Sequence, residues 1–259
     1  MRSPNVRAWL DASPIAGLAL ALMRDATGQP APLEALVPAA PAALAAGARI
    51  AFWSLVAGVG ASTTAALVAQ RSAAARGAPL LVDLDRWAPS LALRARIEGA
   101  NVCDALLRPG REAELLSRWA EVPFLPGSAE LHRSFAGERV VELVTRSAGE
   151  RAAVLDLGAG ADALEHAILA SLTRLCVVAG PRVAQLEAAF AAVPLLLEVP
   201  CPVALVVVGA PAEDADAIAS RLPWRRIAAI PHDPYLADDR FAARAPTMRA
   251  IDALIRGLR

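Results

Sequence analysis

The sequence contains no lysine, because all 26 of its basic residues are arginine. Any reaction or binding mode that depends on a lysine ammonium group is therefore excluded. Acidic residues also number 26, so the formal net charge is zero, and no field of one sign favours nucleic acid as a partner. Aromatic residues make up only 4%, but hydrophobic residues make up 56%, which supplies a sizeable core and excludes global disorder.

Cysteine and histidine are sparse, and no long hydrophobic run is present. The six residues show neither disulfide nor zinc-ligand spacing: Cys103, Cys176, Cys201, His132, His166 and His232. No apolar run reaches the ~18 residues that span a bilayer. The apolar run at 15–23 has no small-residue cleavage site close behind it. We therefore expect a cytoplasmic protein without a transmembrane segment.

Composition divides the chain near residue 48. The first 48 residues hold six prolines, which interrupt any sustained helix or strand, and leave room for one short helix around 15–24. A segment of this length is too short to build a second core. We expect this Pro/Ala-rich extension, 1–48, to be dispensable for folding and to contribute to partner recognition or localisation, although a leader without a role is also compatible with its composition. Residues 49–259 are expected to form the main domain.

Short apolar runs recur after residue 49, and stretches rich in alanine and leucine separate them. Most runs are apolar throughout, which is typical of parallel strands that are covered on both faces. The expected strands are 50–56, 80–84, 122–125, 152–157, 175–178, 203–208 and 227–230, with crossover helices such as 63–76 and 161–172. This alternation predicts an α/β doubly wound domain, with a mostly parallel sheet and helices on both faces.

A glycine-containing turn joins the first strand to the first helix. Gly58 and Gly60 lie in the turn, and Ser62 and Thr63 follow at the start of the helix. Backbone N–H groups in such a turn can bind an anion at the helix N-terminus. Similar turns also serve packing alone, so this motif by itself leaves both interpretations open.

Carboxylates stand at the ends of two further strands. Asp83 and Asp85 end the second strand, and Asp156 lies near the end of the fourth. Ligands of doubly wound sheets bind at the carboxyl ends of the strands. Each carboxylate could also cap a local turn. Together with the glycine turn, however, they predict a phosphate loop, an aspartate pair that positions water or metal, and a second metal-linked aspartate.

The order of these motifs resembles the MinD/ParA superfamily of deviant P-loop ATPases over residues 49–259. The segments Val122–Gly127 and Ile230–Pro234 also match that family's pattern. Within the superfamily the chain is most similar to the CpaE/TadZ-like proteins of tight-adherence pilus systems. The resemblance implies a P-loop NTPase-like fold, ATP and Mg²⁺ as cofactors, and a homodimer.

The resemblance also implies roles for individual residues. The nucleotide-binding set would be Gly58, Val59, Gly60, Ala61, Ser62, Thr63 and Asp233. Mg²⁺ would be held by Ser62, Asp83 and Asp156. Asp85 would be the catalytic residue if the protein hydrolyses ATP.

The loop departs from the family pattern G-K-G-G-x-G-K-[ST]-T at its charged positions. Ala61 replaces the lysine that reaches the β- and γ-phosphates, and Val56 replaces the signature lysine that crosses the dimer. Leu55 stands at the first glycine, and Gly209 falls where the family has an adenine-reading asparagine. Losing one charge-assisted bond to phosphate weakens binding roughly 10- to 100-fold. A cation at the transition state is worth about 10³–10⁵ in rate. We therefore expect weak nucleotide binding and weak or absent hydrolysis.

These features predict a degenerate MinD/ParA-like localisation factor that helps to place a tight-adherence pilus or secretion apparatus. It would act through protein contacts and be recruited to the pole or inner membrane surface by partners. Two alternatives remain: an active ATPase that takes a cation from Arg86 or a partner subunit, and a septum-site regulator of division. Arg86 is otherwise expected to be a solvated loop residue, His232 a turn residue and 165–166 part of a surface helix. The segment 246–259 is expected to be a core helix, with a membrane-surface helix as the alternative.

Overall fold

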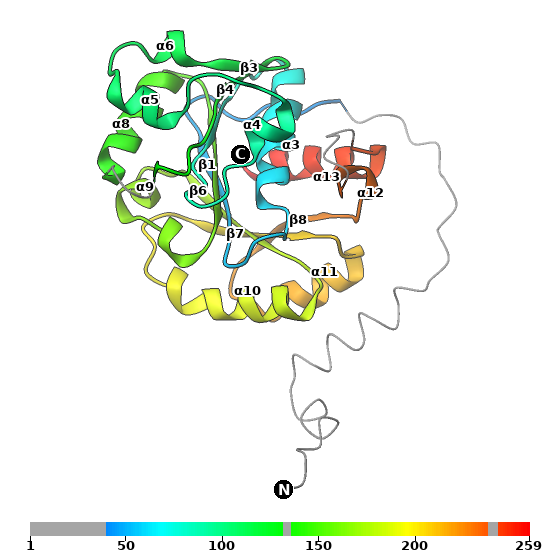
Figure 1. Cartoon of the computed structure of the whole chain (residues 1–259). Coiled ribbons are helices and arrows are strands. Elements are labelled where there is room, and N and C mark those ends of the chain that lie inside the picture. Colours follow the sequence, from blue (N-terminus) through cyan, green and yellow to red (C-terminus); the bar gives the residue numbers. More distant parts are fainter. Residues whose placement is uncertain (1–39, 132–135, 238–242) are drawn as a thin grey trace, which may run out of the picture.

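The computed structural model describes residues 40–131, 136–237 and 243–259, in which a single sheet lies between two layers of helices (Figure 1). The strands are β1 (Arg49–Ser54), β2 (Leu80–Asp83), β3 (Ser117–Trp119), β4 (Val122–Leu125), β5 (Ala153–Ala159), β6 (Arg174–Ala179), β7 (Val203–Val208) and β8 (Arg226–Ile230). The helices are α3 (Ala61–Ala74), α4 (Leu91–Ala95), α5 (Val102–Leu107), α6 (Glu112–Leu115), α8 (Gly137–Ala148), α9 (His166–Ala170), α10 (Val183–Leu196), α11 (Ala212–Ala219), α12 (Pro234–Ala237) and α13 (Ala245–Gly257), with a 3₁₀ turn η1 (Ala161–Ala163). The helix expected at 15–24 lies outside the described residues.

The eight strands follow the order β3-β4-β2-β5-β1-β6-β7-β8. Every pairing is parallel except that of β3 with β4, so the predicted doubly wound, mostly parallel sheet is confirmed. β1 occupies the middle, between β5 and β6, and β2 lies beyond β5. The three strands that precede the glycine turn, Asp83/Asp85 and Asp156 are therefore neighbours, whereas Asp233 follows β8 at the edge of the sheet. Sequence reasoning did not predict β3, whose three residues form an edge strand without a buried run.

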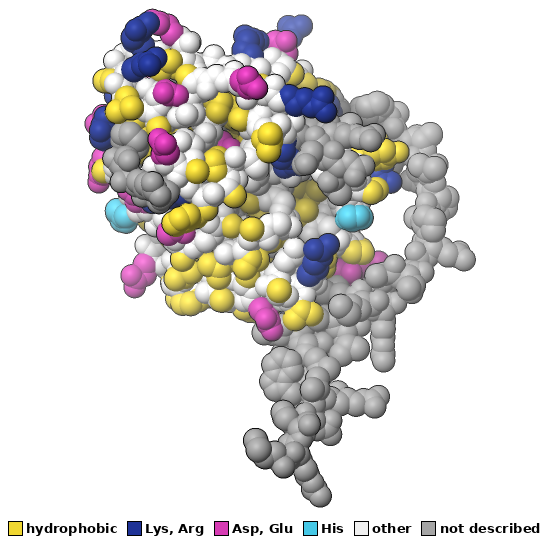
Figure 2. Space-filling view, in the orientation of Figure 1, with side chains coloured by type: hydrophobic (Ala, Val, Ile, Leu, Met, Phe, Trp, Pro, Cys, Tyr) yellow, Lys and Arg dark blue, Asp and Glu magenta, His cyan; other side chains and the backbone are white. Residues whose placement is uncertain are grey.

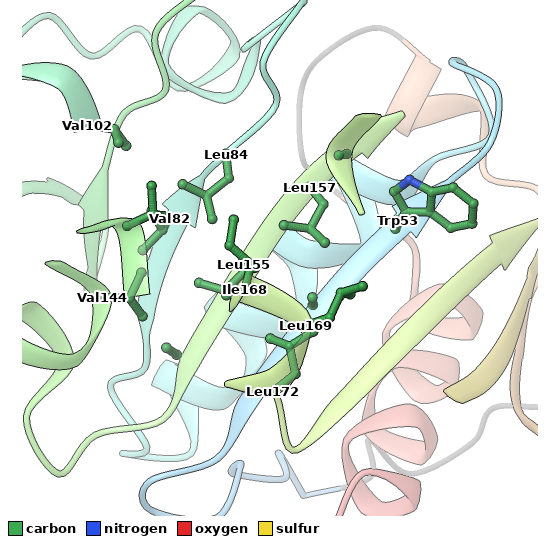
Figure 3. Packing of buried hydrophobic residues seen from close by; sticks show 14 of the residues in the cluster. Trp53, Val82, Leu84, Val102, Val144, Leu155, Leu157, Ile168, Leu169 and Leu172 are labelled. Carbon is green, nitrogen blue, oxygen red and sulfur yellow. The ribbon is translucent and has the colours of Figure 1, made fainter. Parts of the chain in front are cut away.

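Alternate side chains of the strands form two hydrophobic layers. On one face of the sheet, Val82, Leu155 and Leu157 pack with Val144 of α8 and Ile168 of α9 (Figure 3). The same face extends over β6 and β7, where α10 and α11 cover it. The opposite face packs against α3 and α13. Both faces of the sheet are thus buried, which explains why the strands are apolar at consecutive positions.

The predicted helix at 161–172 is wrong, because the segment divides into η1 and the short α9. Between them Glu165 has an extended backbone, with φ −79° and ψ 128°. Its carboxylate accepts hydrogen bonds from the Arg86 guanidinium and from the N–H of Gly137. These two tertiary contacts outweigh the helical pattern of the segment. The expectation that 165–166 belongs to a surface helix holds for His166, which begins α9 and is exposed, but not for Glu165, which precedes α9 and is half-buried.

The described part of the predicted extension, 40–48, is packed into the main domain. Ala42 and Leu44 are buried in the hydrophobic layer under α3 and α13. The N–H of Leu44 donates to the Ser72 hydroxyl at 3.0 Å, and the N–H of Ala42 donates to Asp252 at 3.3 Å. Deletion through residue 48 would remove these contacts, so a deletion that tests the proposed extension should end before Ala42.

The C-terminal segment forms α13, and it is a core helix as predicted. Ile251, Leu254 and Ile255 are fully buried, and Leu258 is nearly so. None of the helices within the described ranges is long and apolar enough to cross a membrane.

Candidate phosphate-binding site

The turn after β1 reverses the chain over the N-terminus of α3. Gly58 and Gly60 have φ values of 77° and 106°, a region that favours glycine. The Thr64 hydroxyl donates to the Gly60 carbonyl at 2.8 Å, which fixes the first turn of the helix. Because α3 begins at Ala61 and not at the expected position 63, Ser62 already lies within its first turn. The loop therefore presents the positive end of the helix dipole to the site.

The two positions that carry lysine in the family pattern are filled by small or packed apolar side chains. Ala61 is 6% exposed and belongs to the hydrophobic layer under α3. Val56 is half-buried and packs against the same layer. Its carbonyl accepts a hydrogen bond from the Ser54 hydroxyl at 2.8 Å, which holds the start of the loop against the end of β1. Val56 therefore contributes to packing within its own chain.

Two cavities, each of about 250 Å³, adjoin the loop and share Gly58, Gly60 and Thr63. The cavity between the loop, β2 and β5 is called the phosphate-side cavity. Its remaining lining residues are Ser54, Ala57, Ala61, Ser62, Asp85, Ala88, Ser90, Arg94, Gly158 and Ala159. The cavity between the loop, β7 and β8 is called the base-side cavity, and it includes Val59, Arg182, Gln185, Gly209, His232 and Asp233. The structure thus distributes the predicted nucleotide set over both sides of one loop.

Asp85 is held over the phosphate-side cavity by the turn that follows β2. Its carboxylate accepts the N–H groups of Trp87 at 3.0 Å and Ala88 at 2.9 Å. Asp83 lies deeper and is fully buried. One oxygen of Asp83 accepts the N–H of Asp85 at 3.1 Å, and the other accepts that of Leu91 at 3.2 Å. Asp83 therefore positions the segment that carries Asp85.

Asp156 lies inside β5 and pairs in register with Asp83 on β2. Burial raises the pKa of Asp156 to about 7, and the charge of Asp85 acts in the same direction. Hydrogen bonds from the Ser62 hydroxyl and the Gly158 N–H, together with the charge of Arg94, oppose this rise. Burial followed by the charge of Asp156 also raises the pKa of Asp83 well above its usual range. The raised pKa values mean that burial favours the neutral form of both carboxyls, and a bound cation would favour their ionised form.

Two glycines leave space for the carboxylates of Asp85 and Asp83. A β-carbon on Gly158 would collide with the Asp85 carboxylate. A β-carbon on Gly127 would lie 2.8 Å from the carboxyl carbon of Asp83 and 2.6 Å from Pro89. Gly158 also has a φ of 65°, so its conformation and its close approach both favour glycine. Each aspartate is therefore paired with a glycine on a neighbouring segment.

Asp233 borders the base-side cavity, but its carboxylate is occupied by its own loop. It accepts the N–H of Tyr235 at 3.1 Å, the N–H of Arg244 at 2.7 Å and the Thr247 hydroxyl at 2.8 Å. Burial alone would raise the pKa of Asp233, but these hydrogen bonds and the charge of Arg244 lower it. His232 is exposed beside it. Asp233 thus fixes the loop that forms the cavity wall.

The basic residues around the site differ from the sequence-based expectation. Arg86 is largely buried and pairs with Glu165, so the prediction of a solvated loop residue is wrong. It lines neither cavity. Arg94 instead lines the phosphate-side cavity, and its Nη1 donates to the Thr63 hydroxyl at 2.9 Å. Sequence reasoning missed Arg94 because nothing in the motif shows that α4 lies beside the loop.

The donor chemistry of the site fits Mg²⁺ together with phosphate. The predicted metal ligands are Ser62, Asp83 and Asp156, and they and Asp85 supply only oxygen atoms, which Mg²⁺ prefers. Of these four residues, Ser62 and Asp85 line the phosphate-side cavity, whereas Asp83 and Asp156 are buried behind it. Mg²⁺ is usually held by one or two carboxylates together with substrate phosphates and water. Within the described ranges, no group of three or more His, Cys, Asp or Glu residues is arranged to hold a metal by itself. Phosphate oxygens would therefore have to complete the coordination.

The fold is that of the MinD/ParA ATPases, as comparison with solved structures shows. The chain is similar to a chain of the MinC:MinD cell division protein complex from Aquifex aeolicus, with 18% identity, a TM-score of 0.67 and coverage of 81% of this chain and 94% of that one. It is similar to a ParA family ATPase from Chlorobium tepidum, with 19% identity, a TM-score of 0.66 and coverage of 81% and 99%. The septum site-determining protein MinD from Pyrococcus horikoshii, complexed with Mg-ADP, matches with 17% identity, a TM-score of 0.64 and coverage of 80% and 94%. No protein-family model and no curated protein matches the sequence.

Proposed function

We propose that the chain is a MinD/ParA-like localisation factor that binds ATP with Mg²⁺ weakly and hydrolyses it slowly or not at all. The observation that carries this proposal is a glycine turn at the N-terminus of α3, bordered by cavities on both sides, in which the buried Ala61 stands at the lysine position of the family pattern. Ser62 and Asp85, which line the phosphate-side cavity, and Asp83 and Asp156, which are buried behind it, support the proposal. The Mg-ADP bound by the Pyrococcus horikoshii neighbour supports the proposed ligand.

The isolated protein is expected to bind ATP-Mg²⁺ weakly and to turn it over far below the ~1–100 s⁻¹ typical of kinases. Substitution Ala61→Lys restores a cation at the helix N-terminus and is expected to tighten binding roughly 10- to 100-fold. Titration calorimetry and a phosphate-release assay measure the two quantities. Ala74→Lys, which adds the same charge at the exposed far end of α3, is the matched control and should change neither.

Turnover within the quoted range that Asp85→Ala abolishes would contradict the proposal and favour an active ATPase. Unchanged affinity in Ala61→Lys, with the fold intact, would indicate that the loop serves packing alone. In that case the nucleotide proposal would fail.

We further propose that two copies associate through the face that carries the phosphate-side cavity, without obligatory control by ATP. Trp87 and Leu93 are 61% and 82% exposed on the segment that follows β2, beside this cavity. Exposed side chains of this size add apolar contact area at an interface. Val56 packs within its own chain. Because it is uncharged, it cannot contact a partner's nucleotide as the signature lysine of the family would.

Sedimentation is expected to show the same dimer with and without ATP-Mg²⁺. The double substitution Trp87→Ser and Leu93→Ser is expected to shift the protein toward monomer, because it removes both exposed apolar side chains. Leu197→Ser, which removes a leucine that is 70% exposed just after α10, serves as the control and should leave the dimer unchanged. A dimer that forms only when ATP-Mg²⁺ is added would overturn the proposed independence from nucleotide.

The cellular role that we propose is placement of a tight-adherence pilus or secretion apparatus through protein contacts. Acidic and basic side chains are mixed on the face drawn in Figure 2, and hydrophobic side chains gather over α10, which supports protein partners and not nucleic acid. The division role of the Aquifex aeolicus neighbour supports a septum-site regulator as the second candidate. Deletion of the gene distinguishes them: lost pili with normal septa support the first role, and misplaced septa support the second.

A further inference from the structure

An arginine that lies outside the loop, Arg94, lines the phosphate-side cavity. Arg94 belongs to α4, which follows the Asp85 turn and lies beside the N-terminus of α3. Its Nη1 donates to the hydroxyl of Thr63, the third residue of α3, at 2.9 Å. Arg94 is half-buried and lines the cavity together with Ser62 and Asp85.

The position of Arg94 matters because the loop has no cation of its own. The chain has no lysine, and Ala61 fills the position where the family places one. A guanidinium is always charged in proteins, and its planar fork matches two phosphate oxygens. Held beside the positive end of α3, it would converge with the helix dipole on one bound anion.

The other charged groups at the cavity argue for a phosphate that arrives with a divalent cation. Asp85 lines the same cavity and would repel an anion that binds alone. Asp156 lies beneath the loop, where the charge of Arg94 already reaches it. A phosphate chain with Mg²⁺ would present negative charge to Arg94 and positive charge to Asp85.

Neither of the other nearby arginines can supply this charge. Arg86 pairs with Glu165, which in turn accepts the N–H of Gly137, and it does not line the cavity. Arg182 lines the base-side cavity, on the opposite side of the loop. Among the described residues, Arg94 is the basic residue that lines the phosphate-side cavity.

We propose that Arg94 replaces the missing loop lysine as the cation that binds the phosphate chain of a nucleotide. The ligand class is a polyphosphate bound with Mg²⁺. This inference deepens the proposed function and rests on it for the nucleotide. The phosphate chain without a base tests Arg94 separately.

The test measures binding of inorganic tripolyphosphate and of ATP, each with Mg²⁺, to the full chain by titration calorimetry. Arg94→Ala is expected to weaken both roughly 10- to 100-fold, as loss of a charge-assisted bond predicts. Arg94→Lys keeps the charge without the planar fork, so its affinity for each ligand is expected to lie between that of Arg94→Ala and that of the unchanged protein. Arg96→Ala, which removes an exposed arginine at the end of the same helix, should bind as the unchanged protein does.

Thermal unfolding without ligand checks that each variant folds, and Arg94→Gln takes the place of Arg94→Ala if the alanine variant does not. Equal affinity for tripolyphosphate in the folded variant and the unchanged protein would overturn the role of Arg94 and leave nucleotide binding intact. Binding of tripolyphosphate that depends on Arg94, without binding of ATP, would support Arg94 and overturn the nucleotide proposal. Absence of binding to either ligand would overturn both.

Discussion

Replacing Asp252 with alanine is expected to lower the free energy of unfolding by about 3–5 kcal/mol, because it removes the buried carboxylate that pairs with the mostly buried Arg71. Asp252 on α13 is fully buried. It accepts the Nε of Arg71 at 2.8 Å and the Nη2 at 2.7 Å, a two-point contact between α13 and α3. It also accepts the N–H of Ala42, so the loss would loosen three segments together.

Chemical denaturation of the two proteins measures this difference, and the midpoint temperature of thermal unfolding should fall by roughly 6–20 °C. Glu121→Ala breaks the pair with Arg118, whose side chains are 82% and 64% exposed, and it is expected to leave stability unchanged. Equal losses in the two variants would contradict the structural role assigned to Asp252. A double substitution, Arg71→Met with Asp252→Leu, should recover much of the stability, because apolar side chains of similar volume then replace the buried ion pair.

Replacing Asp156 with asparagine is expected to stabilise the ligand-free protein at both pH 5 and pH 8, with the larger gain at pH 8. Burial raises the pKa of this carboxyl to about 7 in the folded protein, above its unfolded value near 3.8. The folded state therefore holds a proton that the unfolded state releases between these two values. Stability falls as pH rises through this window, by roughly 4 kcal/mol at most.

Asparagine removes this penalty and still accepts the N–H of Gly158 through Oδ1, a bond that measures 3.0 Å in the native chain. Denaturation in the presence of a chelator, at pH 5 and pH 8, measures the effect. Glu187→Gln removes a carboxyl at an exposed position on α10 and should show no pH-dependent change. If Asp156→Asn destabilises the protein at pH 8, charged partners stabilise the ionised form and the predicted sign is wrong.

The fold could be predicted from the sequence because its strands are buried on both faces. Consecutive apolar residues such as Val203–Val208 predict a parallel strand that is covered on both faces. The glycine turn at 58–60 and the aspartates at 83 and 156 then meet, since neighbouring parallel strands end at one edge of the sheet. The same logic could not predict β3, whose residues Ser117–Trp119 carry no buried pattern.

The site was only partly predictable, since several of its contacts depend on where short segments turn back. Nothing near Arg94 in the sequence shows that α4 places its guanidinium beside Thr63. The pair of Arg86 with Glu165 joins residues 79 positions apart and breaks an otherwise helical stretch. Burial of Leu44 likewise depends on α3 and α13, which the composition of the first 48 residues cannot reveal.

The glycines opposite Asp83 and Asp85 have a consequence for how this chemistry can be recognised in other sequences. Even the smallest added side chain at 158 would occupy the space of the Asp85 carboxylate, and one at 127 would press on Asp83. A chain that exchanged either glycine would have to move the carboxylate or lose it. A sequence search that requires both aspartates, 83 and 85, and both glycines, 127 and 158, should therefore separate chains that keep this pocket from chains that keep only the aspartates.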